Sequence, residues 1–150
     1  MTSMFSALAA GLLLLVGSAA TSANPCELVI ESTDQMSFVQ TELTVPASCK
    51  EVTLTLKHVG TMPATSMGHN WVLTETSKMR SVAIAGMNES ENAYVPKVDA
   101  RVLAHTAVIG GGESDTITFS TAGLTPGGDY SYFCSFPGHW AIMKGKFVFQ

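Results

Sequence analysis

Short segments in which apolar and polar residues alternate, or in which β-branched and aromatic residues gather, constrain this chain most. Eight such segments span residues 26–32, 36–45, 51–59, 70–75, 101–109, 114–120, 129–136 and 145–150. Alternation with a period of two is typical of a strand with one face in a core. Turn-forming stretches such as "GGG" at 110–112 and "TPGGD" at 125–129 separate them. The pattern predicts an all-β fold, an eight-stranded β-sandwich with Greek-key connections.

In one segment between predicted strands, apolar residues recur every three to four positions instead of every two. Apolar residues recur at Met79, Val82, Ala83 and Met87, and Ser77 stands before them as a candidate N-cap. This spacing predicts a short helix over 78–87, inserted between two strands.

Size and charge limit the function. A chain of 150 residues that is 46% hydrophobic and 13% charged should form one domain with a sizeable core. The net charge is -4 and only 8 Lys and Arg are present, whereas a nucleic-acid binder needs a basic surface. We therefore exclude nucleic acid as a partner.

The first 23 residues have the composition of an export signal. They carry no charged side chain, contain the run "LAAGLLLLVGSAA" and end in small residues. We expect cleavage after Ala23 and a mature domain over 24–150, located in the periplasm. No Lys or Arg precedes the apolar run, which is atypical of such signals. The run is short for a transmembrane span, and "ANPC" does not match a lipoprotein signal, so we expect no stable membrane insertion.

Three cysteines agree with export. In an oxidising compartment two cysteines that are close in the sequence tend to pair, so we predict a disulfide between Cys26 and Cys49. Cys134 is then left over. Taken alone, it could be a buried free thiol packed as a small apolar side chain.

The stretch "CSFPGHWAIM" gives Cys134 another interpretation, because His139 and Met143 follow it at x4 and x3 spacing. Upstream, "SMGHNW" supplies His69 just before a predicted strand. Two imidazoles, one thiolate and a weak axial thioether are the ligands of a mononuclear blue-copper site. Each residue alone has an ordinary structural explanation, but the set predicts copper. Zinc suits two histidines and a cysteine but prefers a fourth strong ligand, which a thioether is not.

These segments, with "DQMSF" and "RVLAHT", resemble the azurins of the cupredoxin family over essentially all of residues 24–150. The resemblance implies that His69, Cys134 and His139 bind copper, with Met143 as a distant axial ligand and the Gly68 carbonyl as a weak axial oxygen. It also implies a cupredoxin-like sandwich with a helical flap outside it.

The resemblance assigns supporting roles as well. Asn70 should tie the His69 strand to the Cys134 loop, and the backbone N–H groups of Asn70 and Phe136 should point at the Cys134 sulfur. Trp71 should be a buried core indole whose strand neighbours face outward. Two further histidines match residues that are not ligands: His58, expected to be partly buried, and His105, expected on the surface.

The expected function is electron transfer without catalysis. Strong ligands and two weak axial donors leave no open position for a substrate, so the protein should be a carrier and not an enzyme. Electrons should pass through the edge of His139. By resemblance the partners are redox proteins of a periplasmic chain, such as c-type cytochromes or copper reductases, and the protein should be a monomer.

An uncharged surface should surround His139, because no Asp, Glu, Lys or Arg occurs in 59–74 or 131–143. The predicted docking patch comprises Met62, Met67, Phe136, Pro137, Trp140 and Ala141. At Trp140 azurins generally have a small residue, so its indole could either enlarge the patch or fold against neighbouring loops.

Two other functions are considered. A copper chaperone or storage protein would use methionines, of which there are 8, but in exposed clusters. A copper enzyme such as a nitrite reductase would need a second metal site, for which only His58 and His105 remain.

Overall fold

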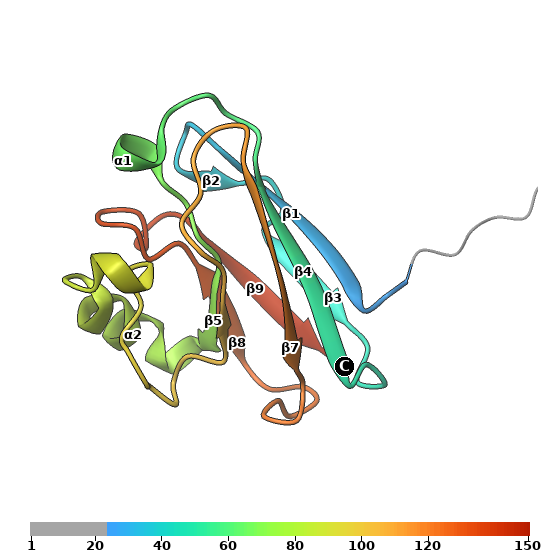
Figure 1. Ribbon diagram of the computed structural model, residues 1–150. Helices are drawn as coiled ribbons and strands as arrows, with labels where there is room; N and C mark the ends of the chain where they lie inside the picture. The colour runs from blue at the N-terminus through green and yellow to red at the C-terminus, as the bar shows by residue number, and fades with distance from the viewer. Residues whose placement is uncertain (1–23) are drawn as a thin grey trace, which may run out of the picture.

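The computed structural model of the protein describes residues 24–150; the predicted export signal, 1–23, lies outside the described residues. Two sheets pack face to face (Figure 1). The first has the order β2-β1-β4-β7 and consists of β1 (Glu27–Thr33), β2 (Ser37–Phe38), β4 (Glu51–His58) and β7 (Ser114–Ser120). The second has the order β3-β9-β8-β5-β6 and consists of β3 (Glu42–Val45), β5 (Val72–Glu75), β6 (Ala104–His105), β8 (Tyr130–Phe133) and β9 (Lys144–Phe149).

The core lies between the two sheets and follows the predicted alternation. On β4 the inward residues Val52, Leu54 and Leu56 are fully buried, while their neighbours reach the surface. Trp71 is fully buried and packs against Tyr132 and other aromatic rings, as the resemblance implied. The predicted all-β sandwich is therefore confirmed.

One predicted strand, 36–45, is divided in two because the chain changes sheet within it. β2 pairs with β1 in the first sheet, and β3 pairs with β9 in the second. Gln40 lies at the crossing and is tied to both layers. Its side-chain oxygen accepts a hydrogen bond from the Glu31 N–H (2.9 Å), and its carbonyl accepts one from the Tyr132 hydroxyl (2.6 Å). The described residues thus form nine strands where eight were expected.

The predicted helix is present as α2 (Met79–Gly86), within about one residue of its expected bounds. The predicted N-cap is wrong. Ser77 lies inside a 3₁₀ turn, η1 (Thr76–Lys78), and α2 begins after Lys78 without a side-chain cap. Two short elements were not predicted: α1 (Ala64–Met67) before the His69 segment and η2 (Ser90–Asn92) after α2.

Residues 76–99, here called the flap, cover the outer face of the second sheet. Val82, Ala83 and Val95 of the flap form a small apolar cluster with Val72 of β5 and Phe133 of β8. The strand neighbours of Trp71 face outward from the main core, as expected, but they do not reach solvent. The flap buries them, so β5 has a core on both faces.

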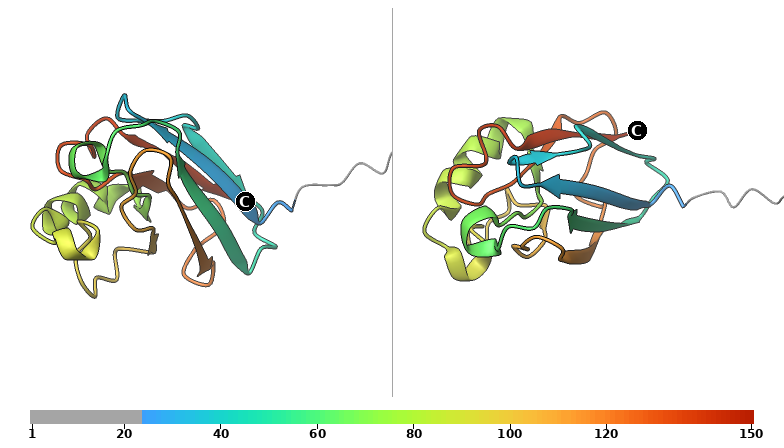
Figure 2. Two further views of the ribbon diagram at one scale, coloured as in Figure 1. Left: turned by 45° about the horizontal axis from the view of Figure 1, so that its top comes forward. Right: turned by 90° about the horizontal axis from the view of Figure 1, so that it is seen from above.

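The loop between β8 and β9 lies at the same end of the sandwich as α1 and the flap, opposite the C-terminus (Figures 1 and 2). At the other end, a disulfide joins Cys26 to Cys49, with a Cα–Cα distance of 5.7 Å. The predicted pairing is confirmed. Cys134 is the one free cysteine, in a chain with three cysteines that all lie within residues 24–150.

Candidate metal centre

Three side chains that are far apart in the sequence meet beneath the β8–β9 loop. The donor atoms of His69, Cys134 and His139 all lie within 4.8 Å of one another, and all three residues are buried. The Cys134 Sγ is 3.8 Å from the His69 Nδ1 and 3.6 Å from the His139 Nδ1. The structure thus brings together the three strong donors that the sequence suggested.

These distances fit a single metal ion. Bonds of about 2.1 and 2.3 Å at roughly 110–120° place a nitrogen and a sulfur ligand about 3.6–3.8 Å apart. The donor set is two imidazoles and one thiol, and Met143, fully buried, lies in the same loop. This composition favours copper over zinc, because a thioether is a soft ligand that suits copper.

His69 is oriented from both ends. Its backbone exchanges hydrogen bonds with Ile109, with lengths of 3.0 and 2.9 Å. Its ring Nε2–H donates to the Thr33 carbonyl at 2.9 Å, which leaves Nδ1 free to face the sulfur. The sequence did not indicate Thr33, because a backbone carbonyl carries no signature of its role.

Gly68 must be a glycine because other groups approach it closely. A Cβ at this position would lie 2.5 Å from the Ala64 carbonyl oxygen, 2.6 Å from a Val108 methyl and 2.9 Å from the Phe136 ring. The Gly68 carbonyl oxygen lies 3.9 Å from the Cys134 Sγ. The predicted weak axial oxygen is therefore beside the centre.

Backbone hydrogen bonds close the 134–143 loop on itself. The Cys134 N–H donates to the Met143 carbonyl (3.0 Å), and the Met143 N–H donates to the His139 carbonyl (2.9 Å). A turn over Phe136 to His139, with the His139 N–H donating to the Phe136 carbonyl (3.0 Å), reverses the chain. These bonds fix the backbone of the loop that carries Cys134, His139 and Met143.

Asn70 connects the two halves of the centre, as the resemblance implied. Its Oδ1 accepts from the Ser135 N–H (2.8 Å), and its Nδ2 donates to the Ser135 hydroxyl oxygen (2.8 Å) and to the Ala93 carbonyl (2.8 Å). The Ser135 hydroxyl donates to the same carbonyl at 3.1 Å. The roles of Ser135 and Ala93 were missed, since neither residue carries a distinctive pattern in the sequence.

Burial controls the protonation of the donors in the metal-free protein. It raises the pKa of the Cys134 thiol to about 12, although the backbone N–H groups of Asn70 and Phe136 act in the opposite direction. It lowers the pKa of His69 to about 4, and it lowers the pKa of His139 as well. The imidazoles are therefore neutral at pH 7, as metal ligands must be.

The other two histidines of the described chain are more buried than expected. His58 is 1% exposed; its ring centroid lies 4.6 Å from that of His69, and its Nε2 is 3.1 Å from the Asp34 carboxylate. His105 is half-buried rather than on the surface, and its Nδ1 lies 3.0 Å from the Thr106 carbonyl.

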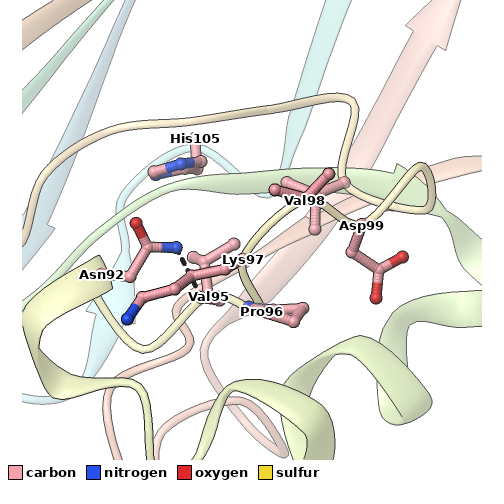
Figure 3. Close-up of a pocket in the computed structure, with 8 residues that line it drawn as sticks. Asn92, Val95, Pro96, Lys97, Val98, Asp99 and His105 are labelled. Atoms are coloured by element: carbon pink, nitrogen blue, oxygen red, sulfur yellow. Dashed lines mark hydrogen bonds between the residues drawn. The ribbon is translucent and has the colours of Figure 1, made fainter.

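His105 borders a hollow of about 420 Å³ that is separate from the metal centre (Figure 3). Two charged side chains at this hollow already have partners. Lys97 lies 3.5 Å from Glu89, and Asp99 pairs with Arg101. Neither charge is left free to recognise a ligand.

The residues of the predicted docking patch differ in exposure. Met62, Pro137 and Ala141 are exposed, whereas Met67 and Phe136 are half-buried. Trp140 is partly buried and packs against the apolar cluster beneath the flap. Of the two alternatives for the indole, this contact favours folding against neighbouring elements.

A rigid β-sandwich that holds two histidines, one cysteine and a methionine in a buried site defines a blue-copper electron-transfer protein. The chain matches the family "copper binding proteins, plastocyanin/azurin family" over residues 24–150, and it belongs to that family.

Individual members of this family are similar along most of the chain. Azurin of Achromobacter denitrificans is 56% identical over 121 residues, which cover 80% of this chain and 81% of that protein. Azurin of Bordetella pertussis is 49% identical over 144 residues, covering 95% and 96%. The solved structure of azurin Az-iso2 from Methylomonas sp. strain J superposes with a TM-score of 0.80 at 40% identity, covering 83% of this chain and 98% of that one.

Proposed function

We propose that this protein is a periplasmic carrier of single electrons that uses one type 1 copper ion and catalyses no reaction itself. The observation that carries the proposal is the buried triad of His69, Cys134 and His139, whose donor atoms lie within 4.8 Å of one another. A closed, buried donor set suits electron exchange, whereas a catalytic metal needs an open position for its substrate.

Each residue of the centre has a distinct role in the proposal. His69, Cys134 and His139 are the strong ligands, Met143 supplies the weak axial thioether, and the Gly68 carbonyl is the opposite weak donor. A bound copper ion would supply the Cu(I)/Cu(II) couple.

The surrounding hydrogen bonds keep the donors in place. The Thr33 carbonyl orients the His69 ring, and the Asn70 side chain links the two ligand-bearing segments. The backbone N–H groups of Asn70 and Phe136 draw electron density from the sulfur. A donor set held this firmly needs little rearrangement when one electron is added or removed.

His139 is the proposed exit for electrons. Its side chain is only 4% exposed, so a partner meets the edge of the ring and not its face. The His139 Nδ1 lies 3.6 Å from the Cys134 Sγ, which leaves the Nε2 on the opposite side of the ring as the edge that faces away from the sulfur. Pro137 and Ala141, two positions from His139 on either side in the sequence, are exposed.

The proposed location is the periplasm. Support comes from the Cys26–Cys49 disulfide, which forms in oxidising compartments, and from the signal-like composition of residues 1–23. Within residues 24–150, no helix is long and apolar enough to cross a membrane.

We propose redox proteins as partners, such as c-type cytochromes or copper reductases, which dock as transient complexes with a monomer. The proposed contact surface is the patch of Met62, Met67, Phe136, Pro137, Trp140 and Ala141. Its uncharged character suits short-lived apolar contacts.

Spectroscopy of the copper-loaded domain over residues 24–150 tests the proposal. We expect an intense visible band from charge transfer between the Cys134 thiolate and Cu(II), and a narrow copper hyperfine splitting in the EPR spectrum. A colourless protein that retains zinc in preference to copper would contradict the proposal.

A further inference from the structure

A chain of aromatic contacts leads from the flap to the metal centre. The Tyr94 ring meets the Phe136 ring edge to face, with centroids 5.3 Å apart. The Phe136 ring in turn lies 4.9 Å from the His139 ring. In Figures 1 and 2 the segment after α2 lies beside the β8–β9 loop, which places this contact at the end of the sandwich that carries the centre.

Tyr94 is held in an uncommon backbone conformation. Ala93 and Tyr94 both have a φ of 56°, in the left-handed region that residues other than glycine rarely adopt. Two consecutive residues keep such a conformation only when the surrounding structure holds them there, and such positions concentrate at functional sites.

The groups that hold this backbone include residues beside the candidate ligands. The Ala93 carbonyl accepts hydrogen bonds from the Asn70 amide (2.8 Å) and the Ser135 hydroxyl (3.1 Å). The Tyr94 N–H donates to the Glu89 carbonyl at 2.9 Å. The Tyr94 carbonyl lies so close to Gly86 that a Cβ there would be 2.1 Å from its oxygen. The flap and the metal centre thus fix Tyr94 jointly.

Phe136 is tied to the candidate ligands by its backbone and by its ring. Its N–H points at the Cys134 sulfur, and its carbonyl accepts the His139 N–H. On one side its ring fills the space that a side chain at Gly68 would need. On another side it borders an open hollow of about 360 Å³, which Tyr94 also lines. Tyr94 is therefore the aromatic neighbour that limits movement of the ring toward this hollow.

We propose that Tyr94 is a positioning residue that fixes the Phe136 ring and, through it, the orientation of His139. The inference deepens the proposed electron transfer and rests on it, because His139 is the residue through which electrons are proposed to pass. The flap then serves two purposes: it covers the second sheet, and it holds the ring that borders the electron exit.

Three variants separate this role from general stabilisation of the flap. Tyr94→Leu removes the aromatic contact, and Tyr94→Phe keeps it while removing the hydroxyl. Met79→Ala is the matched control, because Met79 also packs beneath the flap but belongs to the cluster around Val72 and Phe133.

The first measurement uses the metal-free protein and records the NMR shifts of the His139 ring protons, which sense the ring current of Phe136. Tyr94→Leu should move these shifts, whereas Tyr94→Phe and Met79→Ala should keep the parent values. The second measurement uses the copper-loaded protein. Tyr94→Leu should change the electron self-exchange rate by roughly two- to ten-fold, as expected for loss of one aromatic contact, and should shift the potential.

Parent-like His139 shifts and a parent-like self-exchange rate in Tyr94→Leu would overturn the inference, as would equal changes in Met79→Ala. If Tyr94→Leu does not fold, a change in the same observables in Tyr94→Phe overturns the specific role of the ring, and parent values support it. Because the NMR measurement needs no copper, a failure of copper binding in the parent would reject the proposed function separately.

Discussion

At the residue scale, burial of Cys134 disfavours the thiolate form that a metal ion needs as a ligand. Burial raises the pKa of its thiol to about 12, yet a metal binds the thiolate. The two backbone N–H groups that point at the sulfur, from Asn70 and Phe136, favour the charged form. The site is therefore prepared for a bound cation, which completes the stabilisation of the thiolate.

Substitution of individual donors should give effects that differ in kind. Cys134→Ser should abolish the intense visible band, because the thiolate is the donor of that transition. Met143→Leu should keep the band and raise the potential, because it removes a weak donor to Cu(II). Absorption spectra and voltammetry of both copper-loaded variants measure this. Loss of all copper from Met143→Leu would show that the axial assignment is wrong.

The metal-free protein should lose stability in acid. Burial lowers the pKa of folded His69 from 6.5 to about 4, so between these values the unfolded chain binds more protons than the folded one. The free energy of unfolding therefore falls as the pH falls from about 6.5 to about 4. Urea unfolding of the metal-free protein at several pH values measures the slope. His69→Gln should make the slope shallower without abolishing it, because burial lowers the pKa of His139 as well. A slope unchanged by His69→Gln would contradict the assignment.

At the element scale, the centre depends on segments that hydrogen bonds connect across the fold. The His69 segment pairs with Ile109, the β8–β9 loop closes through Cys134 and Met143, and the flap joins both through Ala93. No single strand carries the site. Its geometry results from the way these three elements are fastened together.

Asn70→Ala should lower the free energy of unfolding more than Ser135→Ala does. The first change leaves the buried Ser135 N–H without its partner, which costs about 1–3 kcal/mol. The second change removes the hydroxyl that accepts one Asn70 Nδ2–H. The other Nδ2–H keeps its bond to the Ala93 carbonyl and the Ser135 N–H keeps its bond to the Asn70 Oδ1, so this change should cost less, about 1 kcal/mol. Chemical denaturation of the metal-free variants gives both values. Equal losses would show that the Asn70 amide does not link the two segments as described.

The disulfide should stabilise the sandwich without influencing the centre. It joins residues 23 apart, at the end opposite the β8–β9 loop. Replacing Cys26 and Cys49 by alanine should lower the free energy of unfolding by about 2–4 kcal/mol. Thermal denaturation measures the loss, and the absorption spectrum of the copper-loaded variant serves as the control. A changed visible band would indicate coupling between the two ends.

At the scale of the whole molecule, two segments beside the centre are uncharged. The flap at the same end nevertheless carries charged residues such as Glu89 and Lys97, and the Asp34 carboxylate accepts a hydrogen bond from the Met62 N–H. The segments 59–74 and 131–143, which surround the centre, contain no Asp, Glu, Lys or Arg. Exposed apolar residues there include Met62 and Ile142. These two segments are therefore suited to apolar contacts with a partner.

Electron transfer to a partner should respond weakly to ionic strength. Without charges in the two segments that make the proposed contact, raising the salt concentration from about 10 to about 200 mM should change the rate by less than about two-fold. Met62→Lys should introduce a clear salt dependence, whereas Trp140→Ser, at a half-buried position, should not. Stopped-flow kinetics with a c-type cytochrome measures all three proteins. A steep salt dependence in the parent would show that charged residues outside these two segments guide docking.

The sequence by itself predicted the fold class and three donors, His69, Cys134 and His139, that the structure brings together. Period-two alternation reveals strands because each strand has one face in the core, and the spacing Cys134-x4-His139-x3-Met143 within one short loop is local information. The disulfide could be predicted for the same reason, because Cys26 and Cys49 are close in the sequence.

Only the tertiary structure decided how distant segments meet. It showed that the chain changes sheets near Gln40, that the flap buries Val72, and that Ala93 accepts hydrogen bonds from both halves of the centre. It also placed Tyr94 against Phe136. Backbone carbonyls and ring contacts of this kind depend on the path of the whole chain. Every residue has a backbone carbonyl, so the sequence does not indicate which carbonyl accepts a given hydrogen bond.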